Sequence, residues 1–405
     1  MNQKLCLIVD AFEQELIEIR RHLHQYPDLS GNEYNTAKFL LKHLDELDVE
    51  AKLLDTEAGP GVIAIMKGKE DSPVVAFRAD MDALPLMDKK LCSYASKIPG
   101  VMHACGHDFN MTCVLGLAKV LNKVKNELEG SVKFIFQPSE ESNKGGATHI
   151  LKSGIMESVD AIWAIHAFPD LPAGSVGIRY GAITSATDAF KLSVKGVSGH
   201  SARPHLAVDS IFVASQIING LYSIIYRKFD PRQPIVISLG TINGGTAPNI
   251  VASQVELSGT VRMFDQQIRS QVPEIVSEVS RGIAASYGAK CDVDWHFGPP
   301  PVINDQELAK LTQFCAENLL GEDGVAIINR PSMGAEDFSR FLWYAPGMLL
   351  RIGTGGEEDV SYPLHSSMFD INEEAIAHSV KLLANVTFSY FELKKTQEEI
   401  KRIEN

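Results

Sequence analysis

The segment Met102–Asp108, MHACGHD, concentrates side chains that can bind a metal ion or take part in catalysis. It places Cys105 two residues before His107, in a chain that has only 6 cysteines and 12 histidines. A thiol and an imidazole at this spacing could ligate a metal ion, could form a nucleophile with its base, or could lie in a buried turn without a chemical role. The segment alone leaves these three interpretations open.

Further polar residues lie in or just after short apolar segments that we predict to be strands: Asp80, Asp82, Glu140, Glu141 and His166. In open α/β sheets ligands bind beyond the carboxyl ends of the strands, so these side chains converge if the strands are neighbours. Thiolate, imidazole and carboxylate are the ligands that a borderline-soft divalent ion prefers. A late histidine, His365, could complete such a set.

Each of these residues also has a purely structural interpretation. The paired glutamates could form a solvated turn, and His166 could be a core histidine with satisfied hydrogen bonds. Asp80 and Asp82 could close a strand with a turn, or Asp80 could orient a ligand imidazole, as carboxylates often do. Cys105 differs from the other five cysteines, which we expect to be small hydrophobic residues, because a helix following it would stabilise its thiolate.

The hydrophobic pattern predicts the elements that would position these residues. The sequence opens with two predicted helices, the second following a capping box at Ser30–Glu33 and extending to Leu47. Short apolar segments at 74–80, 131–137 and 161–168 then alternate with helical stretches. This alternation is typical of a mostly parallel sheet covered by helices.

The pattern changes at about Thr184. From there the predicted elements follow the order β-α-β-β-α-β, the split pattern of a ferredoxin-like sandwich. We therefore predict an α/β fold with two domains. The catalytic domain, a mixed and mostly parallel sheet with helices, would comprise residues 1–183 and 298–405, and residues 184–297 would form an inserted α+β lid domain.

Length and composition limit the classes of protein to which the chain can belong. Its 405 residues exceed the usual size of one hydrophobic core, so two domains are the expectation. A net charge of -13 argues against a nucleic-acid or anionic-membrane partner, which would require a basic surface. Six widely spread cysteines form no disulfide framework, the first residues contain no signal-peptide core, and no segment could span a bilayer. We therefore expect a cytoplasmic protein.

A series of motifs along the chain resembles one enzyme family. In order, they are RRHLHQYPDLSGNE, FRADMDALPL, PGVMHACGHD, FQPSEE, GHSARPH, APNIV, GAEDFS and PLHSSMFDINEEA, and they extend from Arg20 to about Ala375. The family is that of the metal-dependent amidohydrolases, which includes hippurate hydrolase, N-acyl-amino-acid deacylases, N-acetyldiaminopimelate deacetylase and plant auxin-conjugate hydrolases. It is a branch of the aminoacylase and carboxypeptidase clan.

The resemblance implies a binuclear metal centre and assigns its ligands, which would be Cys105, His107, Glu141, His166 and His365. They would bind two divalent ions of Zn, Mn, Co or Ni, with Glu140 as the general acid/base. The inserted domain resembles the family's small domain, which often mediates dimerisation. In it, His200 would help to stabilise the oxyanion, and Asn249 and Arg262 would bind the substrate's carboxylate.

The implied reaction is hydrolysis of the amide bond of an N-acyl amino acid, such as an N-acetyl or N-benzoyl derivative, to a carboxylic acid and a free amino acid. Two nearby cations would lower the pKa of a shared water and polarise the carbonyl, while Glu140 would carry the proton to the leaving amine. The alternatives are a metallo-dipeptidase or carboxypeptidase of the same clan, a hydrolase with Cys105 as nucleophile, and a metal-stabilised binding protein without activity.

Two positions depart from the family's pattern. Asn110 stands where the family commonly has a histidine, and Ser198 stands where it has a second glycine. We expect Asn110 to lie outside the ligand set, so the metal site would persist while the positioning of the substrate would change.

Overall fold

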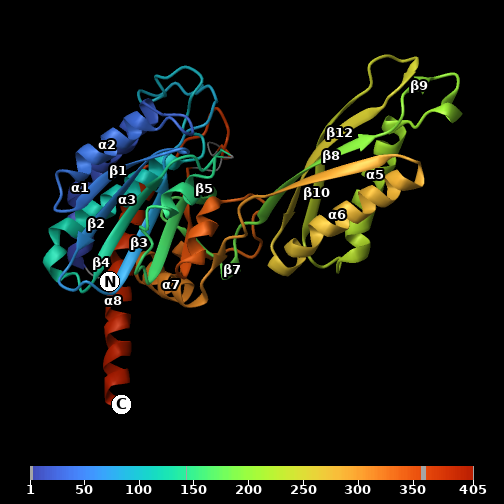
Figure 1. The fold of residues 1–405 in the computed structure, drawn as a ribbon. Helices are drawn as coiled ribbons and strands as arrows, with labels where there is room; N and C mark the ends of the chain where they lie inside the picture. The colour runs from blue at the N-terminus through green and yellow to red at the C-terminus, as the bar shows by residue number, and fades with distance from the viewer. Residues whose placement is uncertain (1–2, 143, 357–361, 405) are drawn as a thin grey trace. The chain divides into compact units, whose positions relative to one another are not determined.

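The computed structural model of the protein describes residues 3–142, 144–356 and 362–404. The chain divides into two compact units (Figure 1). Each unit has its own hydrophobic core. Unit 1 comprises Met1–Ile183, Ile303–Arg330 and Asp337–Asn405, and unit 2 comprises Thr184–Val302 and Pro331–Glu336. Unit 2 is thus built mainly from one long insertion into unit 1.

Unit 1 is organised around an eight-stranded sheet with the order β1-β2-β4-β3-β5-β16-β6-β15. The strands are β1 (Glu50–Thr56), β2 (Gly59–Lys67), β3 (Val74–Asp80), β4 (Ser131–Gln137), β5 (Ala161–Pro172), β6 (Val176–Ile178), β15 (Val325–Ile327) and β16 (Gly347–Gly355). The central neighbours β4, β3, β5 and β16 are parallel, as are β6 and β15, and the remaining pairs are antiparallel. The predicted α/β fold with a mixed, mostly parallel sheet is confirmed.

The helices of unit 1 are α1 (Gln3–Gln25), α2 (Tyr34–Leu44), α3 (His107–Lys123), α4 (Gly146–Leu151), α7 (Gln306–Leu320) and α8 (Glu374–Glu404). Helices α1, α3 and α8 pack on one another, and α3 also contacts the central strands β3, β4 and β5. Every residue of α3 from His107 to Leu121 is buried, as expected of a helix that packs against neighbours all round. The sheet and these helices share one hydrophobic core.

The predicted capping box at Ser30–Glu33 is wrong. Helix α2 begins at Tyr34, and the side chain of Glu33 does not cap it; the N–H of Thr36 in its first turn donates to Asp28 at 2.8 Å. Instead the carboxylate of Glu33 accepts the backbone N–H of Gly31 and of Ser139, each at 2.9 Å. The carboxylate therefore binds the loop after β4, where its partner lies 106 residues away in the sequence.

Unit 2 contains a four-stranded antiparallel sheet with the order β10-β12-β8-β13. The strands are β8 (Ala186–Lys195), β10 (Ile235–Gly244), β12 (Gln254–Met263) and β13 (Lys290–Phe297), and the helices are α5 (Ser210–Lys228) and α6 (Gln266–Ser286). The side chains of Asp209 and Asp265 cap the two helices by accepting N–H groups of the first turn. The predicted ferredoxin-like order of elements is confirmed.

Four short strands complete the structure: β7 (Gly181–Ala182), β9 (Gly199–His200), β11 (Ile250–Val251) and β14 (Ile303–Asn304). Strand β14 pairs with β7, and β11 pairs with β9. Residues 249–264, which the hydrophobic pattern predicts to form a single strand, are therefore divided between β11 and β12. Among the helices in the described ranges, none is long and apolar enough to cross a membrane.

Candidate metal centre

The turn before helix α3 fixes the relation between Cys105 and His107. Gly106 has a φ of 80°, a left-handed conformation that glycine adopts without strain. A Cβ atom at this position would lie 2.5 Å from the Cβ of Ala167, so a larger residue would clash. Cys105 and His107 therefore flank one tight turn, and both are buried at the N-terminus of α3.

Side chains from three further segments converge on this turn. The Sγ atom of Cys105 lies 3.5 Å from Nε2 of His166 on β5 and 3.4 Å from Nε2 of His365. The same His365 nitrogen lies 3.1 Å from Oε1 of Glu141.

These side chains form two groups that have Cys105 in common. Its sulfur lies within 4.8 Å of a ring nitrogen of His107 and of a ring nitrogen of His166. These two nitrogens also lie within 4.8 Å of each other. A second such group joins Cys105 to Glu141 and His365. The five predicted ligands thus lie together, with the sulfur placed where two neighbouring cations could share it.

Backbone carbonyls set the tautomers of two histidines. Nδ1 of His107 donates to the carbonyl of Asp82, and Nδ1 of His166 donates to the carbonyl of Ala167, both at 2.8 Å. Because a carbonyl can only accept, Nδ1 carries the proton and the neutral ring has its lone pair on Nε2. Nε2 of His107 is buried and has no hydrogen-bond partner among the described residues. The chemistry of this donor set therefore fits a metal ion.

The charges around the cluster favour a cation. Burial lowers the pKa of His107, but the neighbouring Asp80 and Cys105 outweigh burial and raise it well above its ordinary value. Burial, together with Arg351, lowers the pKa of His166 to about 3, so this imidazole is neutral. Burial raises the pKa of the Cys105 thiol. A metal ion bound here would displace the protons of Cys105 and His107.

Asp82 connects the two halves of the cluster. Its carboxylate accepts the backbone N–H of Glu140 at 3.0 Å and that of Glu141 at 2.9 Å, and it also accepts the hydroxyl of Ser30 at 2.6 Å. Its carbonyl accepts Nδ1 of His107. One buried residue thus orients an imidazole and holds the backbone of the two glutamates.

Asp80, which the sequence suggested as the residue that orients a ligand imidazole, has different partners. Its carboxylate accepts Nδ2 of Asn110 at 2.7 Å and pairs with the guanidinium of Arg78 at 2.7 Å, while Nε2 of His107 lies 3.7 Å away. The other end of the Asn110 amide accepts the N–H of Ala167 at 3.1 Å. Asn110 therefore links α3 to strands β3 and β5.

The predicted residues of unit 2 lie in two places. His200 on β9 and Asn249 just before β11 are exposed and close in space, since β9 pairs with β11. Nδ1 of His200 accepts the N–H of Ala202 at 3.0 Å, which leaves the proton of the neutral ring on Nε2. Arg262 lies on β12, and its Nη1 donates to the carbonyl of Met333 at 2.7 Å.

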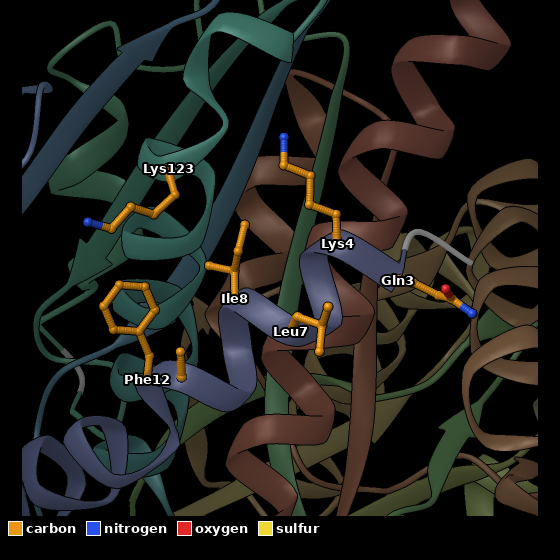
Figure 2. A pocket seen from close by; sticks show the side chains of 7 residues that line it. Gln3, Lys4, Leu7, Ile8, Phe12 and Lys123 are labelled. Atoms are coloured by element: carbon orange, nitrogen blue, oxygen red, sulfur yellow. The ribbon is translucent and has the colours of Figure 1, made fainter.

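A surface groove on unit 1 contains none of the predicted site residues. Figure 2 shows it between helix α1 and the end of α3. Its volume is about 610 Å³. Its lining consists of Gln3, Lys4, Leu7, Ile8, Ala11, Phe12 and Lys123. The lining contains no carboxylate, imidazole or thiol that could bind a metal ion, so the groove is not a candidate metal centre.

The chain is similar to proteins of known name. Residues 76–388, which include every predicted site residue, match the sequence profile of peptidase family M20/M25/M40. The N-acetylcysteine deacetylase of Bacillus subtilis is 39% identical over 386 residues, which cover 95% of this chain and 99% of the relative. The thermostable carboxypeptidase 1 of Saccharolobus solfataricus is 38% identical over 390 residues, covering 93% and 97%.

A third relative and a solved structure agree with these matches. The N-acyl-L-amino acid amidohydrolase of Geobacillus stearothermophilus is 38% identical over 305 residues, covering 75% of this chain and 82% of the relative. The crystal structure of the YXEP protein of Bacillus subtilis, described as a dinuclear metal-binding peptidase, has a TM-score of 0.83 and 36% identity. That similarity covers 95% of this chain and 99% of the other.

Proposed function

The chain belongs to peptidase family M20/M25/M40, and from this premise we propose that it hydrolyses the amide bond of N-acyl amino acids, such as N-acetyl or N-benzoyl derivatives. The products would be a carboxylic acid and a free amino acid. It is a metal-dependent amidohydrolase, as its relatives named deacetylase and amidohydrolase indicate. The observation that carries the proposal is the Cys105 sulfur, which is common to two groups of ligand atoms, one with His107 and His166 and one with Glu141 and His365.

Five residues would bind two divalent ions in this proposal: Cys105, His107, Glu141, His166 and His365. Sulfur, imidazole and carboxylate together suit Zn, Mn, Co or Ni. The unpartnered Nε2 of His107 and the neutral ring of His166 support these assignments. When bound, the two ions supply Lewis acidity, which lowers the pKa of a water and polarises the scissile carbonyl.

Glu140 would act as the general acid/base. A carboxylate oxygen of Glu140 lies within 4.8 Å of ligand atoms of His107 and Glu141, near the cluster without belonging to the groups that contain Cys105. Oε1 of Glu141 also lies 3.1 Å from Nε2 of His365, which supports Glu141 as the ligand and leaves Glu140 to face the substrate. The Glu140 carboxylate would accept a proton from the attacking water and return it to the leaving amine.

Three residues of unit 2 would contact the substrate. His200 would stabilise the oxyanion with its Nε2–H, and Asn249 and Arg262 would bind the carboxylate of the amino acid. The exposure of His200 and Asn249 supports this proposal, because an exposed polar group is available to a ligand. Arg262 uses Nη1 for the carbonyl of Met333, and a guanidinium has further N–H groups for a carboxylate.

Unit 2 would also form a homodimer. Strand β10 is an edge of its sheet, and several large apolar side chains of β10 and α5 are exposed: Ile211, Phe212, Tyr222, Tyr226, Val236 and Ile242. An edge strand with apolar neighbours can pair with a second copy. Sedimentation equilibrium tests this, and a monomer at micromolar concentration would contradict it. A cytoplasmic location remains a prediction from the sequence.

A carboxypeptidase is the second candidate, favoured by the similarity to the thermostable carboxypeptidase 1. The same cluster would serve it, and only the shape of the substrate's acyl part would differ. A cysteine hydrolase is disfavoured because burial raises the pKa of the Cys105 thiol, whereas a nucleophilic cysteine needs a lowered pKa.

Removal of metal tests the proposal directly. We expect dialysis against a chelator to abolish hydrolysis of N-acetyl, N-benzoyl and indole-acetyl amino acids, and added Mn or Zn to restore it. Dipeptides assayed in parallel separate the amidohydrolase from the carboxypeptidase. Full activity of the chelated protein on any of these substrates would refute a metal-dependent reaction.

A further inference from the structure

One buried arginine joins the two segments that carry most of the proposed ligands. Arg20 lies on α1, and its side chain is completely buried. Its Nε donates to Oδ2 of Asp108 at 2.9 Å, and its Nη2 donates to Oδ1 of Asp370 at 2.8 Å. Asp108 directly follows His107, and Asp370 lies five residues after His365. A single guanidinium therefore bridges the first turn of α3 and the segment after His365.

Both carboxylates are also fixed to the backbone of their own segment. Asp108 Oδ1 accepts the N–H of Phe109 at 2.9 Å, and Asp108 Oδ2 lies 2.6 Å from Nδ1 of His24. Asp370 accepts the N–H of Ile371 at 2.9 Å and the hydroxyl of Tyr94 at 2.8 Å. Because each carboxylate is immobilised in this way, its bond to the guanidinium constrains the backbone as well as the side chain.

The segment that carries His365 is held by contacts with neighbouring segments. Residues 362–373 contain neither helix nor strand, and His365 itself has a φ of 65°, which is uncommon for a residue other than glycine. Its N–H donates to the carbonyl of Ala104 at 2.7 Å, and Lys90 Nζ donates to the carbonyl of Phe369 at 2.7 Å. The N–H of Lys89 also donates to the carbonyl of Ser367 at 3.0 Å, and the N–H of Asn372 donates to the carbonyl of Thr354 on β16 at 2.9 Å. The segment takes its position from these contacts together with Arg20.

We propose that Arg20 is a positioning residue for metal binding, whose guanidinium sets the distance between the Cys105–His107 turn and His365. This inference rests on the proposed metal-dependent function. In this proposal, Arg20 on helix α1 preorganises the ligands in the metal-free protein, although it is not a ligand itself.

The geometry explains why arginine is needed. The guanidinium is planar and offers several N–H groups in a fixed fork, so it can hold two carboxylates at once in defined directions. A lysine at the same position is a single point charge on a flexible stem and cannot fix both. Residues that orient metal ligands from outside the coordination sphere typically contribute about 10- to 100-fold to metal affinity.

Unit 2 provides a matched control for the effect of a buried arginine on stability alone. Arg269 is also buried and pairs with Asp188, with contacts of 3.0 Å from Nε and 2.6 Å from Nη2. It contacts no proposed ligand in the described part of the chain. Replacing either arginine by lysine should lower the free energy of unfolding, but only the replacement in unit 1 should alter metal binding.

The experiment measures Zn and Mn affinity of the full chain by calorimetry after chelation, for the wild type, Arg20→Lys and Arg269→Lys. We expect Arg20→Lys to bind metal about 10- to 100-fold more weakly and Arg269→Lys to bind like the wild type. Circular dichroism and urea denaturation check that both variants are folded. Equal affinities of all three proteins would overturn the inference, and so would equal weakening in both variants.

A second variant covers the case in which Arg20→Lys does not fold. Asp370→Asn keeps the shape of the side chain and its backbone contact but removes the charge that pairs with the guanidinium, and we expect weaker metal affinity with a native circular dichroism spectrum. Wild-type affinity in folded Asp370→Asn would overturn the inference. If the wild-type chain itself binds no metal, the proposed function fails as well, so the two failures are distinguishable.

Discussion

The Cys105 cluster of unit 1 and the His200 region of unit 2 both contain candidate active-site residues, but water reaches them very differently. In unit 1, His107 and His166 are buried, and each ring is held by a backbone carbonyl at 2.8 Å. In unit 2, His200 is exposed, and its ring accepts the N–H of Ala202 in its own loop. The cluster in unit 1 is fixed by partners from several strands and loops, whereas the ring of His200 bonds to its own loop.

This difference separates two ways of stabilising a polar group. A buried group needs fixed partners because water cannot reach it, so the fold itself preorganises His107 and His166, whereas His365 of the same cluster is exposed. An exposed group is stabilised by water, and its exact position adds little to folding. Substitutions of the buried ligands His107 and His166 should therefore change metal binding and stability together, whereas substitutions near His200 should change the reaction alone.

The largest effect should come from the pair Glu140 and Glu141. Glu140→Gln keeps the shape of the side chain but cannot accept the proton of the water, so we expect a folded, metal-loaded protein with kcat lower by roughly 10²- to 10⁴-fold. Glu141→Gln removes a charged ligand instead, and we expect weaker metal retention with partial rescue by excess metal. Metal content by elemental analysis and hydrolysis rates, measured on both variants, check this prediction.

Two outcomes would change these assignments. If Glu140→Gln loses metal and Glu141→Gln retains it, the roles of the two glutamates are reversed. If Glu140→Gln is fully active, a carboxylate base is unnecessary and Cys105 becomes the better candidate for the nucleophile. Glu140 would then have no catalytic role in unit 1.

A smaller effect is expected from His200→Ala in unit 2. Loss of one oxyanion donor should lower kcat by about 10²-fold, while metal content and the unfolding temperature stay unchanged because the residue is exposed. His205→Ala, at an exposed histidine of the same unit, is the control and should retain wild-type kcat. An unchanged kcat in His200→Ala would remove this residue from the reaction.

Two kinds of cluster residue could be predicted from the sequence: those in one contiguous motif and those that follow the end of a strand. The Cys105–His107 turn is a contiguous motif, and Glu140 follows a strand whose apolar pattern is plain. Because β4, β3 and β5 are parallel neighbours, the residues that follow their carboxyl ends meet at one edge of the sheet, as the sequence predicts. The inserted ferredoxin-like sandwich is likewise recognisable from the order of its elements.

The partners of buried charges could not be predicted from the sequence. Arg20 and Asp370 are 350 residues apart, and nothing in the pattern of either segment indicates the other. Glu33 is misleading because its spacing from Ser30 satisfies a local capping rule, while the folded chain offers it the N–H of Ser139. The hydrogen-bond partner of a buried charged side chain depends on which backbone groups lack a partner after the sheet has formed.

The smallest expected effect concerns this same Glu33, and it tests whether buried charge in unit 1 carries a cost that exposed charge in unit 2 does not. Burial raises the pKa of Glu33 from 4.5 to about 7, and the neighbouring Asp82 adds to the increase, although the N–H groups of Gly31 and Ser139 oppose it. Because the folded-state pKa lies above the unfolded value, Glu33 favours folding below pH 4.5, and this contribution is lost as the pH rises through about 7.

Glu33→Gln removes the ionisation but keeps an oxygen that can accept both N–H groups. In the metal-free protein we expect the variant to unfold about 2–4 °C above the wild type at pH 8 and at nearly the same temperature at pH 5. Glu274→Gln, at an exposed position of α6 in unit 2, should show no such difference between the two pH values. Scanning calorimetry measures all three proteins. If Glu33→Gln is less stable than the wild type at both pH values, the loop before Glu140 needs the negative charge of Glu33, and the cost of burying it is already offset within unit 1.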